Sequence, residues 1–138
     1  MLLPTLTRRE RGLLFSFALF GMTLPSLPRL FPAQELAKFV RFTAGCADPQ
    51  VATAGYHEDS LVFLTGTGLR HTNGEGAADF LKQGGCRFAF VEARQERAFA
   101  QRAEDLGLRY ARVYRVDGIN ISGLRPIAVT VFRTEPTP

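Results

Sequence analysis

The most prominent feature of the hydrophobic pattern is an uncharged apolar segment that runs from Gly12 to Pro28, directly behind Arg8, Arg9 and Arg11. As a helix rising about 1.5 Å per residue, this segment would cover roughly 26 Å, slightly less than a hydrocarbon core of about 30 Å. Arginines in front of an apolar helix stay on the cytoplasmic side and direct the following chain outward. The pattern therefore predicts a membrane helix followed by a domain outside the cytoplasm.

The apolar segment has two other interpretations, a cleaved signal peptide and an arm packed on the domain. A signal peptide that is removed would need small residues at a cleavage site, whereas here the apolar stretch is followed by Pro25, Pro28, Arg29 and Pro32. Prolines end a soluble helix as readily as a membrane helix. A hydrophobic N-terminal arm that packs on the domain is therefore the remaining alternative.

The rest of the chain alternates short apolar strands with amphipathic helices. Leu36, Phe39 and Val40 recur at helical spacing, whereas residues 127–132 alternate as in a strand. The predicted elements are helices over 34–46, 75–84 and 94–106, a short helix capped by Asp59 or Ser60, and strands over 51–55, 67–72, 87–92, 110–116 and 127–132, the last two joined by a turn at 117–123. They predict an α/β fold: a small sheet of four to five strands with covering helices and a C-terminal antiparallel hairpin, preceded by an N-terminal apolar helix.

This pattern divides the chain into three parts. Residues 1–32 are interpreted as the apolar membrane helix and its exit, residues 33–48 as an amphipathic connecting helix, and residues 49–138 as the extracytoplasmic α/β domain. About 105 residues beyond the apolar segment are enough for one small domain with one core.

Charge adds a prediction about partners. The chain has 17 basic and 13 acidic residues and a net charge of +4, spread along its length. Arg29, Lys38 and Arg41 follow the apolar segment, so basic residues flank it on both sides. Such flanks suit anionic lipid headgroups better than the continuous stripe that tracks nucleic-acid phosphates. A lipid bilayer is the predicted partner, and nucleic acid is not.

Cys46 and Cys86 are the two cysteines, and they lie 40 residues apart, too far for a CxxC motif. Outside the cytoplasm they could form a disulfide that ties the helix before the domain to the sheet. Two buried thiols that act as small hydrophobic residues are the equal alternative.

The densest polar cluster follows the first predicted strand, where α/β folds commonly place ligands. Its members Tyr56, His57, Glu58 and Ser60 are the candidate binding loop. A plain loop and helix-cap role is the alternative, because neighbouring side chains seldom point the same way and His71 has no recognised ligand spacing to them. Neither a phosphate-binding glycine loop nor a G-x-S-x-G elbow is present. No catalytic residue, cofactor or metal site is predicted.

Four segments in combination resemble the C-terminal end of bacterial membrane glycosyltransferases of the protein mannosyltransferase and aminoarabinose transferase type, which use polyprenyl-linked sugars. The resemblance extends from Val51 to Glu135, and residues 12–32 also look like that family's last membrane helix. The segments that carry it are Ala54–Leu64 (AGYHEDSLVFL), the helix over Ala77–Leu81 that ends at Gly84-Gly85, Phe88–Glu92, and Gly118–Gly123 (GINISG). One departure is Asp59, where the family pattern has proline after the glutamate.

The resemblance implies a part of such an enzyme rather than the whole. In that family a long multi-helix membrane region carries the acidic catalytic residues, and it precedes a small periplasmic α/β domain. The resemblance therefore implies a truncated or split enzyme, inactive alone, held in the inner membrane by a single pass with its C-terminal domain in the periplasm. It would cover or position the acceptor side, with a multi-helix glycosyltransferase subunit or a lipid-linked sugar as partner. The alternative is a membrane-anchored small-molecule-binding or accessory protein, with Tyr56, His57 and Glu58 lining a pocket.

Overall fold

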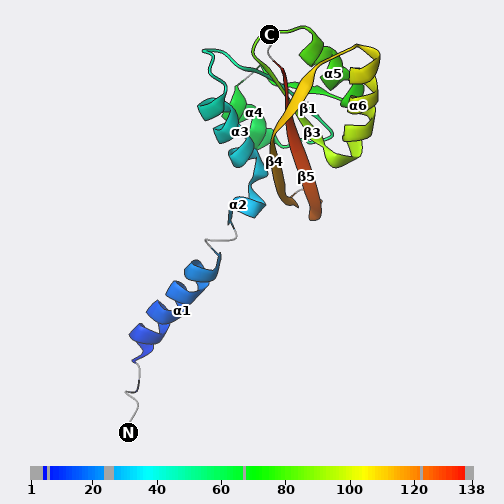
Figure 1. The fold of residues 1–138 in the computed structure, drawn as a ribbon. Coiled ribbons are helices and arrows are strands. Elements are labelled where there is room, and N and C mark those ends of the chain that lie inside the picture. Colours follow the sequence, from blue (N-terminus) through cyan, green and yellow to red (C-terminus); the bar gives the residue numbers. More distant parts are fainter. Residues whose placement is uncertain (1–4, 6, 24–26, 67, 122, 136–138) are drawn as a thin grey trace.

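The structure, a computed structural model, describes residues 5, 7–23, 27–66, 68–121 and 123–135 (Figure 1). Its elements are α1 (Arg8–Thr23), α2 (Leu27–Leu30), α3 (Pro32–Thr43), β1 (Gln50–Ala54), α4 (Asp59–Thr65), β2 (Arg70–Thr72), α5 (Gly74–Lys82), β3 (Arg87–Glu92), the 3₁₀ turn η2 (Ala93–Gln95), α6 (Glu96–Asp105), β4 (Tyr110–Asn120) and β5 (Arg125–Thr134). The strands form one sheet in the order β2-β1-β3-β5-β4. This confirms the predicted α/β class, the strand number and the C-terminal antiparallel hairpin.

Helices cover both faces of this mixed sheet. β1 pairs in parallel with β2 and β3, and β5 pairs antiparallel with β3 and β4. Because β2 and β3 flank β1 on opposite sides, the two parallel crossovers run in opposite directions and place α4 and α5 on opposite faces. One core cluster joins α3 and α4 to the sheet through Leu36, Val40, Leu61 and Phe90. The other cluster joins α5 and α6 to the opposite face, and Phe99 lies at its centre.

The amphipathic helix predicted over 34–46 forms as α3 and packs on the sheet. Leu36 and Val40 are buried, and the ring of Phe39 stacks on Tyr114 of β4 with 4.4 Å between centroids. α3 therefore shares the core of the α/β domain.

The hairpin is longer than the sequence predicted. Asp117 and Gly118 were expected in the turn, but they pair with Ala128 and Ile127 inside the β4–β5 ladder. Gly118 serves close packing here, since a Cβ at this position would lie 2.9 Å from the carbonyl oxygen of Arg29. The junction between α2 and α3 thus crosses β4 directly over Gly118. The turn of the hairpin is confined to the residues after Asn120.

α1 extends away from the domain, and none of its residues is buried (Figure 1). The alternative of an arm packed on the domain is therefore not what the structure contains. α1 is 16 residues long and includes Arg8, Arg9 and Arg11. Among the described residues, no helix is both long and apolar enough to cross a bilayer, so the predicted N-terminal membrane helix is not supported. Leu24, Pro25 and Ser26, part of that predicted segment, lie outside the described residues.

The chain enters the domain at one particular edge. α2 contacts β4 near the C-terminal end of that strand. The carboxyl ends of β1 and β3 lie on the same side of the sheet, because Glu92 at the end of β3 pairs with Val129, close to the start of β5, and β1 runs parallel to β3. We call this side the entry edge. It consists of α2, the loop over 55–60, the segment over 92–95 and the end of the hairpin over 119–121 and 123–126.

Candidate functional site

The loop after β1 turns sharply at Gly55, which has a φ of +80°. A Cβ on Gly55 would lie 2.8 Å from Cγ of Gln95 and 2.9 Å from Oε2 of Glu92, so only glycine fits this approach. The hydroxyl of Thr53 donates a hydrogen bond to the carbonyl oxygen of Tyr56 at 2.8 Å, which fixes the next residue of the turn. The backbone therefore holds the candidate loop firmly against the end of β3.

Tyr56, one of the predicted site residues, is part of the core, with 1% of its surface exposed. Its hydroxyl lies close to the Glu58 carboxylate and to the backbone of Ala33, but neither that hydroxyl nor Oε1 of Glu58, both buried, makes a hydrogen bond of good geometry among the described residues. Burial, and secondarily the Glu58 carboxylate, raises the pKa of Tyr56 far above its usual range. Tyr56 therefore stays neutral at physiological pH and supports the loop from below.

His57 is exposed, and its ring lies against that of His71, for which the sequence indicated no partner. Its ring stacks on that of His71, with 5.0 Å between centroids and 13° between the planes. The parallel register of β1 and β2 places His71 beside Thr53, one strand over from the loop. The sequence did not predict that these two histidines are neighbours. Only a prediction that β1 pairs with β2 would have indicated it.

A hollow of about 380 Å³ lies along the candidate loop. His57, Glu58, Asp59 and Ser60 form its polar side, and Phe31 and Ile121 form its apolar sides. The hydroxyl of Ser60 donates to Oε2 of Glu58 at 3.1 Å, so these two predicted site residues are coupled. The arrangement presents carboxylates and a hydroxyl to hydroxyl or amine groups of a ligand.

The crevice between β1 and β3, where an open α/β sheet usually receives its ligand, is filled. Glu92, whose side chain is 12% exposed, pairs with Arg94 at 3.3 Å. Oε1 of Gln95 accepts a hydrogen bond from the backbone N–H of Gly74 at 2.9 Å. The open space therefore lies on the outer side of the loop, toward the entry edge.

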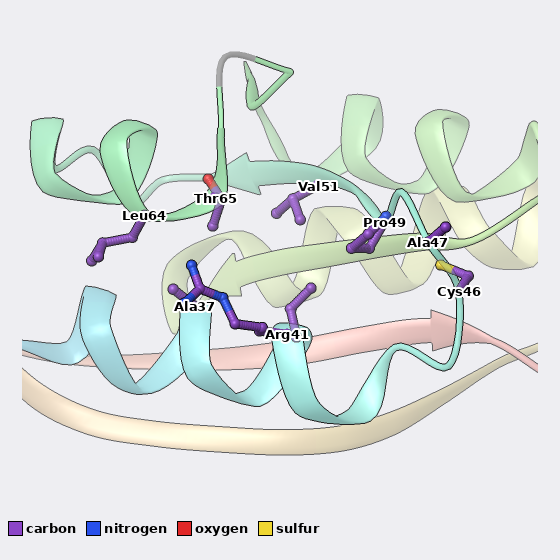
Figure 2. Close-up of a pocket in the computed structure, with 9 residues that line it drawn as sticks. Ala37, Arg41, Cys46, Ala47, Pro49, Val51, Leu64 and Thr65 are labelled. Carbon is purple, nitrogen blue, oxygen red and sulfur yellow. The ribbon is translucent and has the colours of Figure 1, made fainter.

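A second hollow, of about 260 Å³, lies between α3 and α4 at the opposite end of the domain (Figure 2). Its walls include the apolar side chains of Val51 and Leu64, and Figure 2 shows the Arg41 side chain reaching from α3 toward α4. The Thr65 hydroxyl is engaged within α4, where it donates to the carbonyl of Leu61 at 2.6 Å. The hollow therefore offers one guanidinium to a ligand.

Cys46, at one end of that second hollow, is joined to Cys86 by a disulfide. The two Cα atoms are 6.5 Å apart, and 40 residues separate them in the sequence. The bond ties the segment after α3 to the residue just before β3.

Among the described residues, no three His, Cys, Asp or Glu side chains lie together as a metal site would need. Comparison of the chain with protein-family models, with curated proteins and with solved structures found no match. Any function must therefore be argued from the residues themselves.

Proposed function

We propose that this chain is a membrane-tethered, non-catalytic module with its α/β domain outside the cytoplasm, similar to the C-terminal module of a membrane glycosyltransferase that uses lipid-linked sugar. Its role is to cover or position the acceptor side of a membrane active site that another subunit supplies. One observation carries this proposal: the candidate loop and the point where the apolar N-terminal segment joins the domain lie at the same entry edge. A tether at this edge holds the loop close to the bilayer.

α1 supplies the tether. Six of its large apolar side chains are between 51% and 83% exposed: Leu13, Leu14, Phe15, Phe17, Leu19 and Phe20. At about 1.5 kcal/mol or more for each, transfer from water to lipid favours binding by on the order of 10 kcal/mol. Its 16 residues extend about 24 Å, less than a hydrocarbon core of about 30 Å, so the proposed crossing relies on the whole uncharged sequence over 12–28 and not on α1 alone. Arg8, Arg9 and Arg11 reach headgroups on the cytoplasmic side by extending their long side chains.

The Cys46–Cys86 disulfide supports the outward placement of the domain. Disulfides persist in oxidising compartments such as the periplasm, whereas the cytosol keeps most thiols reduced. The position of the arginines and the oxidation of the cysteines are independent arguments, and both support the proposal that the domain lies outside the cytoplasm.

The proposed lack of activity in the isolated chain is supported by the chemistry of the loop. Glycosyl transfer needs acidic groups placed around the reacting carbon and a groove for the lipid carrier. Glu58 and Asp59 instead stand side by side at the start of α4, on one side of an open hollow. Such a loop can contact an acceptor but does not enclose a reacting sugar.

Membrane fractionation of charge-insertion variants tests the tether. The full chain should stay in the membrane pellet after washing with alkaline carbonate. Leu14→Glu/Phe17→Glu should release it, because two carboxylates would have to enter the lipid. Phe63→Glu is the matched control, since Phe63 is 88% exposed but lies on α4 of the domain. Release of the unaltered chain, or equal release of both variants, would contradict the tether.

A membrane-anchored small-molecule-binding protein is the second candidate. The hollow beside the loop favours it, because its buried and unpartnered Glu58 oxygen would gain a partner from a hydroxyl or amine ligand. A thermal-shift series with neutral sugars and amino sugars tests this idea on the purified full chain. A shift that Glu58→Gln abolishes supports it, and no shift at millimolar ligand excludes it.

A further inference from the structure

We propose that the tip of the β4–β5 hairpin docks into the headgroup layer of an anionic membrane, beside the N-terminal tether. This inference rests on the proposed function and deepens it, since it names the surface that sets the height and tilt of the domain above the lipid. The surface, which we call the hairpin tip, consists of Ile119, Ile121, Leu124 and Arg125, together with the neighbouring Arg29 and Phe31 of the α2–α3 junction.

The hairpin projects beyond the rest of the sheet. The last residue of β3, Glu92, pairs with Val129, so the β5 residues from Arg125 to Ala128 continue past the parallel strands and, among the described strands, pair with β4 alone. At about 3.3 Å per residue, this ribbon extends roughly 13 Å further. Figure 1 shows β4 and β5 reaching toward the side where α2 begins. A two-stranded ribbon that projects into water gains little stability by itself.

The side chains of the tip are apolar where a turn is usually polar. Ile121 is 47% exposed and Leu124 is 82% exposed. Phe31, which is 38% exposed, faces the same hollow as Ile121. Large apolar side chains that are this exposed on a projecting turn suit insertion between lipid headgroups.

The backbone at Leu124 has a φ of +47°. Glycine or asparagine adopts this left-handed conformation with little cost, whereas leucine is rarely found there. Leu124 is therefore a large apolar residue in a backbone conformation that disfavours leucine, and its side chain is exposed to solvent. A contact outside the domain would account for the choice, because the domain itself gains nothing from this leucine.

Charge selects an anionic lipid surface as the occupant. Arg29 and Arg125 are exposed at the same edge. Among the described residues, no carboxylate forms an ion pair with either arginine. Apolar side chains flanked by unpaired arginines match the boundary between acyl chains and anionic headgroups. The tether enters the domain through α2 at this same edge, so the surface is continuous with the membrane contact already proposed.

A fluorescent label beside the tip tests the inference on the full chain. Gly123→Cys, labelled with an environment-sensitive dye, keeps Ile121 and Leu124 in place, and the native cysteines are joined to each other. Gln83→Cys is the matched control, since Gln83 is exposed at the opposite end of the sheet, before β3. The labelled proteins are added to preformed vesicles of phosphatidylglycerol and phosphatidylethanolamine, which leaves the domain outside.

The expected result is a shift of the emission at position 123 to shorter wavelength, quenching by nitroxide-labelled headgroups, and protection from aqueous iodide. The label at position 83 should show none of these. Arg29→Gln and Arg125→Gln should each lower the ratio of docked to undocked tip by about fivefold, and phosphatidylcholine vesicles should lower it as well. Ile121→Ser/Leu124→Asn should return the label at 123 to water, and asparagine tolerates the left-handed backbone so that the domain still folds.

Flotation of the vesicles separates this inference from the function it rests on. If the protein floats with the vesicles but the labels at 123 and 83 are equally open to iodide, the docking surface is refuted and the tether stands. If the protein does not float with the vesicles, both proposals are refuted.

Discussion

Removing the disulfide tests how the domain is stabilised. The Cys46→Ala/Cys86→Ala variant frees a loop of 40 residues that includes β1, α4, β2 and α5. The loop-entropy relation assigns about 13 cal/mol/K to a loop of this length, which corresponds to about 4 kcal/mol at 25 °C. The full chain contains no tryptophan, so urea unfolding is followed by circular dichroism in the same detergent for both proteins.

The expected result is a loss of about 4 kcal/mol in the free energy of unfolding, with little change in the urea dependence. With a dependence of roughly 1.5 kcal/mol per molar urea, the midpoint should fall by 2 to 3 M. Treatment with dithiothreitol should bring the unaltered chain to the value of the variant and leave the variant itself unchanged. A difference below about 1 kcal/mol, with equal urea dependence, would refute the assigned role of the disulfide.

Three further predictions concern single side chains near the candidate loop. Gly55→Ala should lower the free energy of unfolding by about 1 to 3 kcal/mol more than Gly45→Ala. Both glycines have positive φ, but only the Cβ added at Gly55 would meet neighbouring atoms, since none lies within 4 Å of a Cβ at Gly45. Equal losses of stability would contradict the close approach at Gly55. Since folding raises the pKa of Tyr56, stability should fall as pH rises above the ordinary tyrosine value of 10.0. Tyr56→Phe should reduce that alkaline loss and cost less than about 1 kcal/mol at pH 7, and a larger cost in urea unfolding would mean that the hydroxyl has a partner. Gly118→Ala should cost about 1 to 3 kcal/mol, because its Cβ would meet the Arg29 carbonyl at 2.9 Å, and unchanged stability would mean that the α2–α3 junction does not rest on β4.

The sequence predicted the elements with strong local patterns. β3 was predicted over Arg87–Glu92, the range that the structure has, and α3 followed from the helical spacing of Leu36 and Val40. Local periodicity is enough for such elements because it records which face is buried. The same logic misplaced Gly118, since a glycine that permits close packing looks identical in sequence to a glycine that permits a turn.

The candidate site could be predicted only in part. The loop residues His57, Glu58 and Ser60 do line a hollow, but Tyr56 is part of the core beneath them. Phe31 of the α2–α3 junction, Ile121 of the hairpin turn and His71 of β2 lie beside these loop residues. Their approach depends on strand order and register, which are non-local and leave no spacing signal in the chain.

A reporter fused after Pro138 tests the central claim most directly. Alkaline phosphatase, which is active only outside the cytoplasm, should be active in this position, and β-galactosidase fused at the same position should be inactive. Changing Arg8, Arg9 and Arg11 to glutamate should weaken that orientation, because the proposed topology relies on basic residues that stay on the cytoplasmic side. An intact but silent phosphatase fusion, together with an active β-galactosidase fusion, would place the domain in the cytoplasm and contradict the proposed function.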